Sequence, residues 1–104
     1  MLHQVPLGGS VLLIWLYGEL DLDTTAPLRD AMVQVASRPG DYCRLLLDLS
    51  ALTYCDNTGL FSLLGSCQAL DAAGITVDII ETGSVARAAI NRAGLWHRLP
   101  LRAP

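Results

Sequence analysis

Apolar residues occur along the chain in runs whose spacing changes from strand-like to helix-like. Two runs, 11–17 and 45–49, are apolar almost without interruption, and this pattern predicts strands buried on both faces of a sheet. A short run at 2–7 leads into Gly8-Gly9, a pair typical of a β-hairpin. The segment 75–80 predicts a further strand with partial alternation of apolar and polar residues.

Three other segments place apolar residues three and four positions apart, which is the spacing of one helix face. Thr24 or Thr25 is the expected N-cap of the first helix, Asp56 or Asn57 that of the second, and Ser84 that of the third. The expected helix ends are Arg38-Pro39-Gly40, Gly74 and Gly94. The expected buried faces are Leu28, Ala31, Met32 and Val35, then Leu60, Leu63, Leu64, Cys67 and Leu70, then Val85, Ala89, Ile90 and Ala93.

The elements therefore follow the order strand, strand, helix, strand, helix, strand, helix. Strands that alternate with helices need parallel crossovers, in which the helices cover a sheet. The N-terminal hairpin adds one antiparallel pair. The sequence thus predicts a single α/β domain, residues 1–104, with a mixed, mostly parallel sheet and helices packed on it.

The composition raises the question of a membrane protein. Hydrophobic residues make up 52% of the chain and charged residues 16%, a balance that excludes intrinsic disorder. The longest apolar run, 11–17, is far shorter than the ~20 residues that span a membrane. No Lys or Arg precedes this run, which argues against a signal peptide. We therefore expect no membrane insertion, with the apolar residues absorbed by a buried sheet.

Charge and cysteine usage narrow the class of partner. The formal net charge is −3, and the seven basic residues are arginines scattered along the chain, which argues against nucleic-acid binding.

Cys43, Cys55 and Cys67 form no Cys-x-x-Cys motif and have no histidine close in sequence, which argues against a zinc site. They are expected to be free, reduced and mostly buried, as in a cytoplasmic protein. Cys55 is interpreted as a small residue of the core rather than as a reactive thiol.

The sequence contains no arrangement typical of an enzyme active site. There is no Ser/His/Asp set, and Gly8-Gly9-Ser10 lacks the Gly-Lys-Ser/Thr of a phosphate-binding loop. We expect neither enzymatic activity nor a cofactor. Asp21, Asp23, Asp48 and Asp56 border expected strand ends, where they could gather to bind a cation. For each of these aspartates, a structural role as a helix cap or as a hydrogen-bond acceptor in a loop is favoured over cation binding.

The loop 54–60 is the most informative segment for function. A polar stretch follows an expected buried strand and opens an amphipathic helix, whose free N–H groups and dipole favour an anion. A hydroxyl group here is therefore well placed to carry a phosphoryl group. Taken alone, these residues favour a purely structural role for the loop. In this role an aspartate caps the helix, and Gly59 allows the helix to approach the sheet closely.

Four motifs then occur in a characteristic order. Gly18-Glu19-Leu20-Asp21 ends a strand, and Thr24-Thr25-Ala26-Pro27-Leu28 opens a helix. Leu45-Leu46-Leu47-Asp48-Leu49-Ser50 forms a central strand, and Asp56-Asn57-Thr58-Gly59-Leu60 opens the next helix. From about Val11 to Leu99 the chain resembles the STAS domain, and within it the small anti-sigma factor antagonists.

The resemblance implies regulation of transcription by partner switching. Such an antagonist binds an anti-sigma factor of the serine-kinase type and so frees a sigma factor. Phosphorylation of a serine at the start of the second helix breaks the complex. The expected partner-binding residues are Asp21, Asp23, Asp56, Asn57, Thr58, Gly59 and Phe61. Phe61 lies outside the row of leucines on the buried face of its helix. Two roles for Phe61 are therefore weighed equally: an anchor for the partner, or a side chain that covers the edge of the helix.

The chain departs from the family at the phosphorylated position, where Asn57 replaces the serine. Three hypotheses follow, in order of preference. Asn57 mimics the unphosphorylated serine and leaves a constitutive binder; Thr58 has become the acceptor; or the chain has left the phosphorylation switch and binds something else.

An alternative function belongs to a different class. A STAS accessory module would use the same loop to hold a nucleotide or lipid, or to dock on a transporter ATPase. The sequence names no particular sigma factor and leaves formation of a homo-oligomer open.

Overall fold

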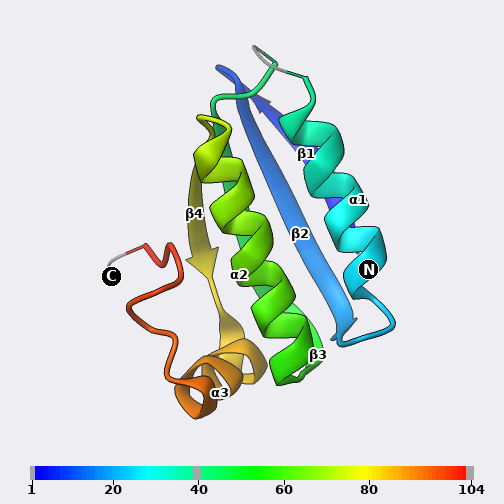
Figure 1. The fold of residues 1–104 in the computed structure, drawn as a ribbon, viewed down its shortest axis with the longest axis vertical. Coiled ribbons are helices and arrows are strands. Elements are labelled where there is room, and N and C mark those ends of the chain that lie inside the picture. Colours follow the sequence, from blue (N-terminus) through cyan, green and yellow to red (C-terminus); the bar gives the residue numbers. More distant parts are fainter. Residues whose placement is uncertain (1, 39–40, 103–104) are drawn as a thin grey trace.

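The computed structural model of this protein describes residues 2–38 and 41–102. Its sheet contains four strands, β1 (Leu2–Gly8), β2 (Val11–Leu20), β3 (Arg44–Cys55) and β4 (Thr76–Glu81). Its helices are α1 (Thr25–Ala36), α2 (Asn57–Ala72) and α3 (Gly83–Ala93) (Figure 1). The order of elements is the one that the spacing of apolar residues predicts.

The sheet is mixed, with the strands in the order β1-β2-β3-β4. β1 runs antiparallel to β2, and the pairs β2–β3 and β3–β4 are parallel. The antiparallel pair is the hairpin predicted at Gly8-Gly9, and both glycines have positive φ. The parallel pairs arise because a helix connects each pair of strands. The predicted fold class is therefore confirmed.

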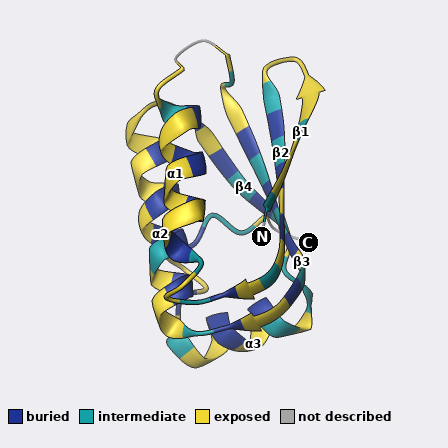
Figure 2. Ribbon diagram, turned by 90° about the vertical axis from the view of Figure 1, so that its right-hand side faces the viewer, coloured by how far each residue is buried: buried dark blue, intermediate teal, exposed yellow. Residues whose placement is uncertain are grey.

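Helices α1 and α2 cover one face of the sheet, and α3 lies at one end of it (Figure 2). The residues of β2 that point toward these helices, Leu12, Ile14 and Leu16, are fully buried. On the other face, Trp15 and Tyr17 are 41% and 43% exposed. The prediction of burial on both faces was therefore wrong for 11–17, whereas in 45–49 the side chains on this second face, Leu46 and Asp48, are half-buried. The open face also carries apolar side chains, so the polar alternation that marks a half-exposed strand is missing from the sequence.

The predicted helix faces form the core with the sheet. Leu28, Ala31, Met32 and Val35 of α1 are buried, as are the predicted apolar residues of α2. In α3, Ala89 and Ile90 are buried together with Ala86, whereas Val85 and Ala93 are only half-buried. Helix α2 ends as predicted, since Gly74 has φ +86° and the Ile75 N–H donates to the Leu70 carbonyl.

Two boundaries differ from the prediction. Strand β3 continues to Cys55, through residues expected to form a loop, because β2 also extends to Leu20 and the two strands pair to their ends around two bulges. Helix α3 begins at Gly83 after Thr82, and not after Ser84, because the chain turns earlier at Gly83, where φ is +69°. The predicted stop Pro39-Gly40 lies outside the described residues; α1 ends at Ala36.

The segment after α3 returns to the sheet beside β4. Leu101 forms a parallel bridge with Ile79. The Ile79 N–H donates to the Pro100 carbonyl, and the Arg102 N–H donates to the Ile79 carbonyl. Across the described part of the chain, no helix combines the length and apolar character that crossing a membrane would require.

Candidate functional site

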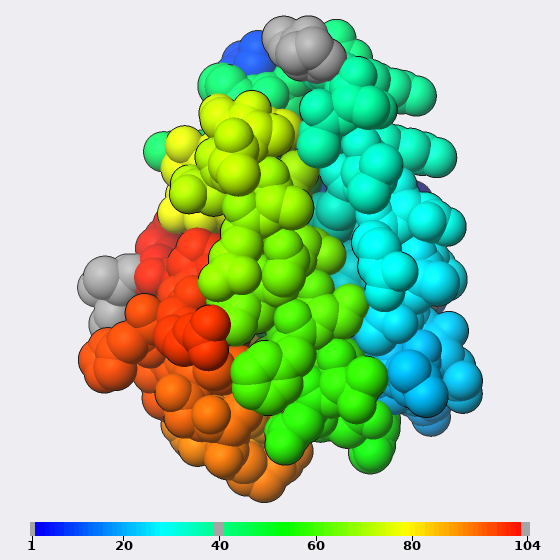
Figure 3. All heavy atoms as spheres, in the orientation of Figure 1, coloured from blue at the N-terminus to red at the C-terminus, as the bar shows by residue number. Residues whose placement is uncertain are grey.

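The start of α2 is held directly against the end of β2. The Asp56 N–H donates to the Leu20 carbonyl at 3.2 Å. A Cβ atom at Gly59 would lie 2.3 Å from the Leu20 carbonyl oxygen, so only glycine allows the helix to approach this closely. The first turn of α2 and the loop from β2 into α1 therefore lie at the same end of the molecule. Figure 3 shows the lower part of α2, in green, beside this blue loop.

Asp56 is the N-cap of α2, which decides between the two predicted caps. Its backbone is extended, with φ −103° and ψ 177°, and its Oδ1 accepts a hydrogen bond from the Gly59 N–H at 2.8 Å. This bond satisfies one of the backbone donors that the first turn of a helix leaves free. The Asp56 carboxylate is consequently directed into its own helix rather than toward a partner.

Replacing Asp56 with alanine removes this cap, and we expect the free energy of unfolding to fall by about 1 kcal/mol. Urea denaturation followed by circular dichroism measures the change. Asp30→Ala is the matched control, because Asp30 is an exposed aspartate within α1 that caps no helix, and we expect it to stay within about 0.5 kcal/mol of the parent. Equal losses for the two variants would show that overall charge, and not the cap, is responsible.

Asp21 organises the loop between β2 and α1. Its Oδ1 accepts hydrogen bonds from the N–H groups of Asp23, at 3.0 Å, and Thr24, at 3.2 Å. In return, the Thr24 hydroxyl accepts from the Asp21 N–H at 2.9 Å. Of the two predicted N-caps of α1, the structure has Thr24 at this position, but its side chain bonds back to the loop and makes no capping bond to the helix. Asp21 is thus a structural residue of the turn.

Five residues at this end point outward, and we call them the docking surface: Leu22, Asp23, Asn57, Thr58 and Phe61. Asn57 and Thr58 are exposed on the first turn of α2, and Phe61 follows one turn later with 48% of its surface exposed. Leu22 is 70% exposed and was missed by the sequence analysis. A lone leucine between two loop aspartates was the signal that could have identified it.

The candidate site residues therefore separate into two groups. Asp23, Asn57, Thr58 and Phe61 face outward, whereas Asp21, Asp56 and buried Gly59 shape the backbone beneath them.

The fourth aspartate considered for a cation site, Asp48, pairs in register with Trp15, well before the strand ends. Its Oδ1 accepts from the N–H and the hydroxyl of Ser50 at 2.9 and 2.6 Å. Within residues 2–38 and 41–102, no group of three or more His, Cys, Asp or Glu side chains is arranged to hold a metal ion.

The chain matches the family model described as "Mlab, STAS domain" over residues 3–102. The chain belongs to this STAS-domain family. No curated protein matches it.

Solved structures share the STAS fold at low sequence identity. An anti-sigma factor antagonist from Mycobacterium paratuberculosis matches with a TM-score of 0.80 at 23% identity, covering 100% of this chain and 86% of that one. The anti-sigma factor antagonist SpoIIAA in its unphosphorylated form matches with a TM-score of 0.76 at 17% identity, covering 99% and 89%. Murine Slc26a9, an anion transporter, matches with a TM-score of 0.74 at 14% identity, covering 88% of this chain but 16% of the transporter.

Cys55 is the last residue of β3 and directly precedes Asp56, the N-cap of α2. It is buried, and burial raises the pKa of its thiol to about 11, with the charge of Asp56 adding to the rise and that of Arg92 opposing it. Burial likewise raises the pKa of Cys67 to about 12. Such thiols are poor nucleophiles at neutral pH, which supports the favoured interpretation of Cys55 as a core residue. Cys43 is exposed, so two of the three cysteines are buried, in line with the prediction that the cysteines are free and mostly buried.

Proposed function

We propose that this STAS domain is an anti-sigma factor antagonist that binds an anti-sigma factor of the serine-kinase type through the docking surface. The observation that carries the proposal is the exposure of Asn57 and Thr58 on a helix start whose position is fixed by backbone contacts with Leu20. The likeness to two anti-sigma factor antagonists over nearly the whole chain supports it.

The docking surface combines apolar anchors, the uncharged polar groups of α2 and one loop carboxylate, that of Asp23. Phe61 and Leu22 supply exposed apolar area at the same end of the molecule as Asn57 and Thr58, and such a mixture is found in energetically important parts of interfaces. The Asn57 amide offers two donors and an acceptor without a charge. A partner can therefore bury this surface without leaving an ionised side chain of α2 unpaired.

Asn57 occupies the position at which the family carries the phosphorylated serine, and an amide cannot accept a phosphoryl group in its place. We propose that the chain binds constitutively, in the state that corresponds to the unphosphorylated antagonist. Thr58 is exposed and retains a hydroxyl, so phosphorylation at Thr58 is the competing hypothesis.

Asn57→Asp tests the proposal because it adds a negative charge with almost no change of shape. An aspartate in the first turn favours the helix dipole, so stability should be unchanged or slightly higher. Affinity for the partner should fall by about tenfold or more, because the interface must then bury a charge. Isothermal titration calorimetry measures the affinity, and thermal denaturation checks the fold.

The matched control is Gln68→Glu, which places the same charge on an exposed position of α2. This position lies eleven residues further on, about 16 Å along the helix, and should leave affinity unchanged. Equal loss in both variants would assign the effect to net charge, and no loss in either would remove the docking surface from the partner site.

The partner itself is identified by affinity capture from native cytosol with the parent chain and with Asn57→Asp as parallel baits. Capture of a serine-kinase-type anti-sigma factor by the parent, and its loss with Asn57→Asp, would support the proposal. A second candidate function, an accessory module of a transporter, is favoured by the likeness to the anion transporter Slc26a9. Selective enrichment of a transporter ATPase would replace the first proposal with this one.

A further inference from the structure

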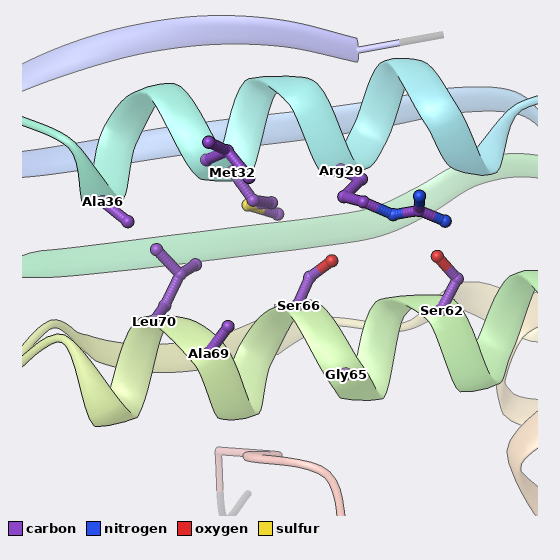
Figure 4. Close-up of a pocket in the computed structure, with 9 residues that line it drawn as sticks. Arg29, Met32, Ala36, Ser62, Gly65, Ser66, Ala69 and Leu70 are labelled. Carbon is purple, nitrogen blue, oxygen red and sulfur yellow. The ribbon is translucent and has the colours of Figure 1, made fainter.

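A cavity of about 430 Å³ lies between α1 and α2, away from the open face of the sheet (Figure 4). It exists because α2 presents small residues toward α1. Gly65 and Ala69 line it from α2, and Ala36 lines it from α1, so the two helices do not fill the space between them. A volume of this size lies within the range of about 300–1,000 Å³ that is typical of small-molecule sites.

The two ends of this cavity differ in polarity. Arg29 of α1 and the hydroxyl groups of Ser62 and Ser66 on α2 lie toward one end, where they point toward one another (Figure 4). Ala36 and Leu70 lie at the opposite end, and the remaining lining is apolar. The cavity therefore offers a cation and two hydroxyls to a polar head, and an apolar slot to a tail.

The guanidinium of Arg29 is available to a ligand. In the parts of the chain that the structure describes, ion pairs join Asp78 to Arg44 and to Arg102, and none involves Arg29. No carboxylate lines the cavity, so its charge is not neutralised from within. The two oxygens of a carboxylate match one guanidinium fork. A phosphate monoester carries nearly two negative charges, whereas this end of the cavity offers a single cation. A carboxylate therefore matches the charge of this end better than a phosphate does.

From this arrangement we infer that the cavity between α1 and α2 binds a single-chain amphiphile with a carboxylate head, of the fatty-acid class. The head lies at Arg29, Ser62 and Ser66, and the hydrocarbon chain lies along Met32 toward Leu70. This site is distinct from the docking surface. The inference therefore does not depend on which partner the docking surface binds.

The probe is dodecanoate, titrated below its micellar concentration into the full chain and measured by calorimetry. We expect saturable binding of one molecule, with hexanoate weaker because it buries less apolar area. Dodecyltrimethylammonium, which has the same tail and a cationic head, should not compete. Absence of binding up to near-millimolar dodecanoate would overturn the inference, as would equal binding of the two dodecyl compounds.

Gly65→Leu tests whether the space between the helices is the site. Gly65 lies between Ser62 and Ser66 (Figure 4), a Cβ there meets no heavy atom within 4 Å, and the new side chain would occupy the cavity. We expect a loss of dodecanoate affinity of about tenfold or more while the domain stays folded, because leucine also favours helix over glycine. Gln68→Leu is the control: the same side chain on an exposed position of α2 outside the cavity should bind as the parent does. Equal loss in both variants would contradict the site.

Arg29→Gln tests the head group. We expect dodecanoate affinity to fall by about tenfold or more, whereas uncharged dodecanol should bind nearly as in the parent. Arg87→Gln, which removes an exposed arginine from α3, is the control and should change neither ligand. If Arg29→Gln and Arg87→Gln behaved alike, binding would depend on net charge, and the assignment of the head to Arg29 would be wrong.

Discussion

Gly59→Ala is expected to destabilise the domain by about 3 kcal/mol or more, although it adds a single methyl group. The methyl carbon would lie 2.3 Å from the Leu20 carbonyl oxygen and 2.9 Å from the Asp21 nitrogen. Both contacts are with backbone atoms, which cannot move aside as a flexible side chain can. The first turn of α2 must shift instead, and the hydrogen bond from Asp56 to Leu20 would be lost with it. Urea denaturation monitored by circular dichroism gives the change in stability.

Gly65→Ala is the matched control for this variant. It makes the same substitution in the same helix, but its methyl group meets no heavy atom within 4 Å. Because alanine favours helix over glycine by up to about 1 kcal/mol, Gly65→Ala should be neutral or stabilising. Opposite signs for the two alanines would confirm that contact with Leu20 decides the outcome. A similar small gain in both would show that α2 is free to move away from the sheet.

Leu60→Ala is expected to lower the free energy of unfolding by about 3 kcal/mol. Leu60 has no exposed surface and packs in the core beneath the first turn of α2. Truncation leaves a cavity in addition to the lost burial of apolar atoms, and both effects reduce stability. The position of the helix start depends on this side chain, so partner binding should weaken as well. Thermal and urea denaturation measure the stability change.

Phe61→Ala, at the next position, separates packing from binding. Phe61 is 48% exposed, so its removal should change stability by much less than Leu60→Ala. If it is an anchor of the docking surface, partner affinity should nevertheless fall by about tenfold or more. A stability loss close to that of Leu60→Ala, with affinity unchanged, would assign Phe61 to covering the helix edge.

The helices were predictable because most of their buried residues are apolar and repeat at helical spacing, as in Leu60, Leu63, Leu64 and Leu70. The strands were predictable in number and order but not in their exposure. Trp15 and Tyr17 present large apolar side chains to the open face, which the sequence cannot distinguish from a second buried face. The extent of β3 depends on its pairing with β2 across bulges, and this pairing is a property of two strands together.

The site was predictable where the signal is local and not where it depends on tertiary contacts. Asp56 lies three residues before the N–H that it caps, so its role is visible in the sequence. The contact of Gly59 with Leu20 joins residues that are far apart in the chain. The cavity between α1 and α2 likewise depends on small residues that meet only when both helices pack on the sheet.

Each lateral edge of the sheet carries a feature that disfavours the addition of another strand. On the β4 side, the backbone of Ile79 is already bonded to Pro100 and Arg102. On the β1 side, Pro6 has no N–H to donate, and the register shifts between Pro6 and Gly8. A chain this rich in β-forming apolar residues would otherwise be prone to edge-to-edge polymerisation. Its strands can thus stay long and apolar while pairing with a further strand is disfavoured at both edges.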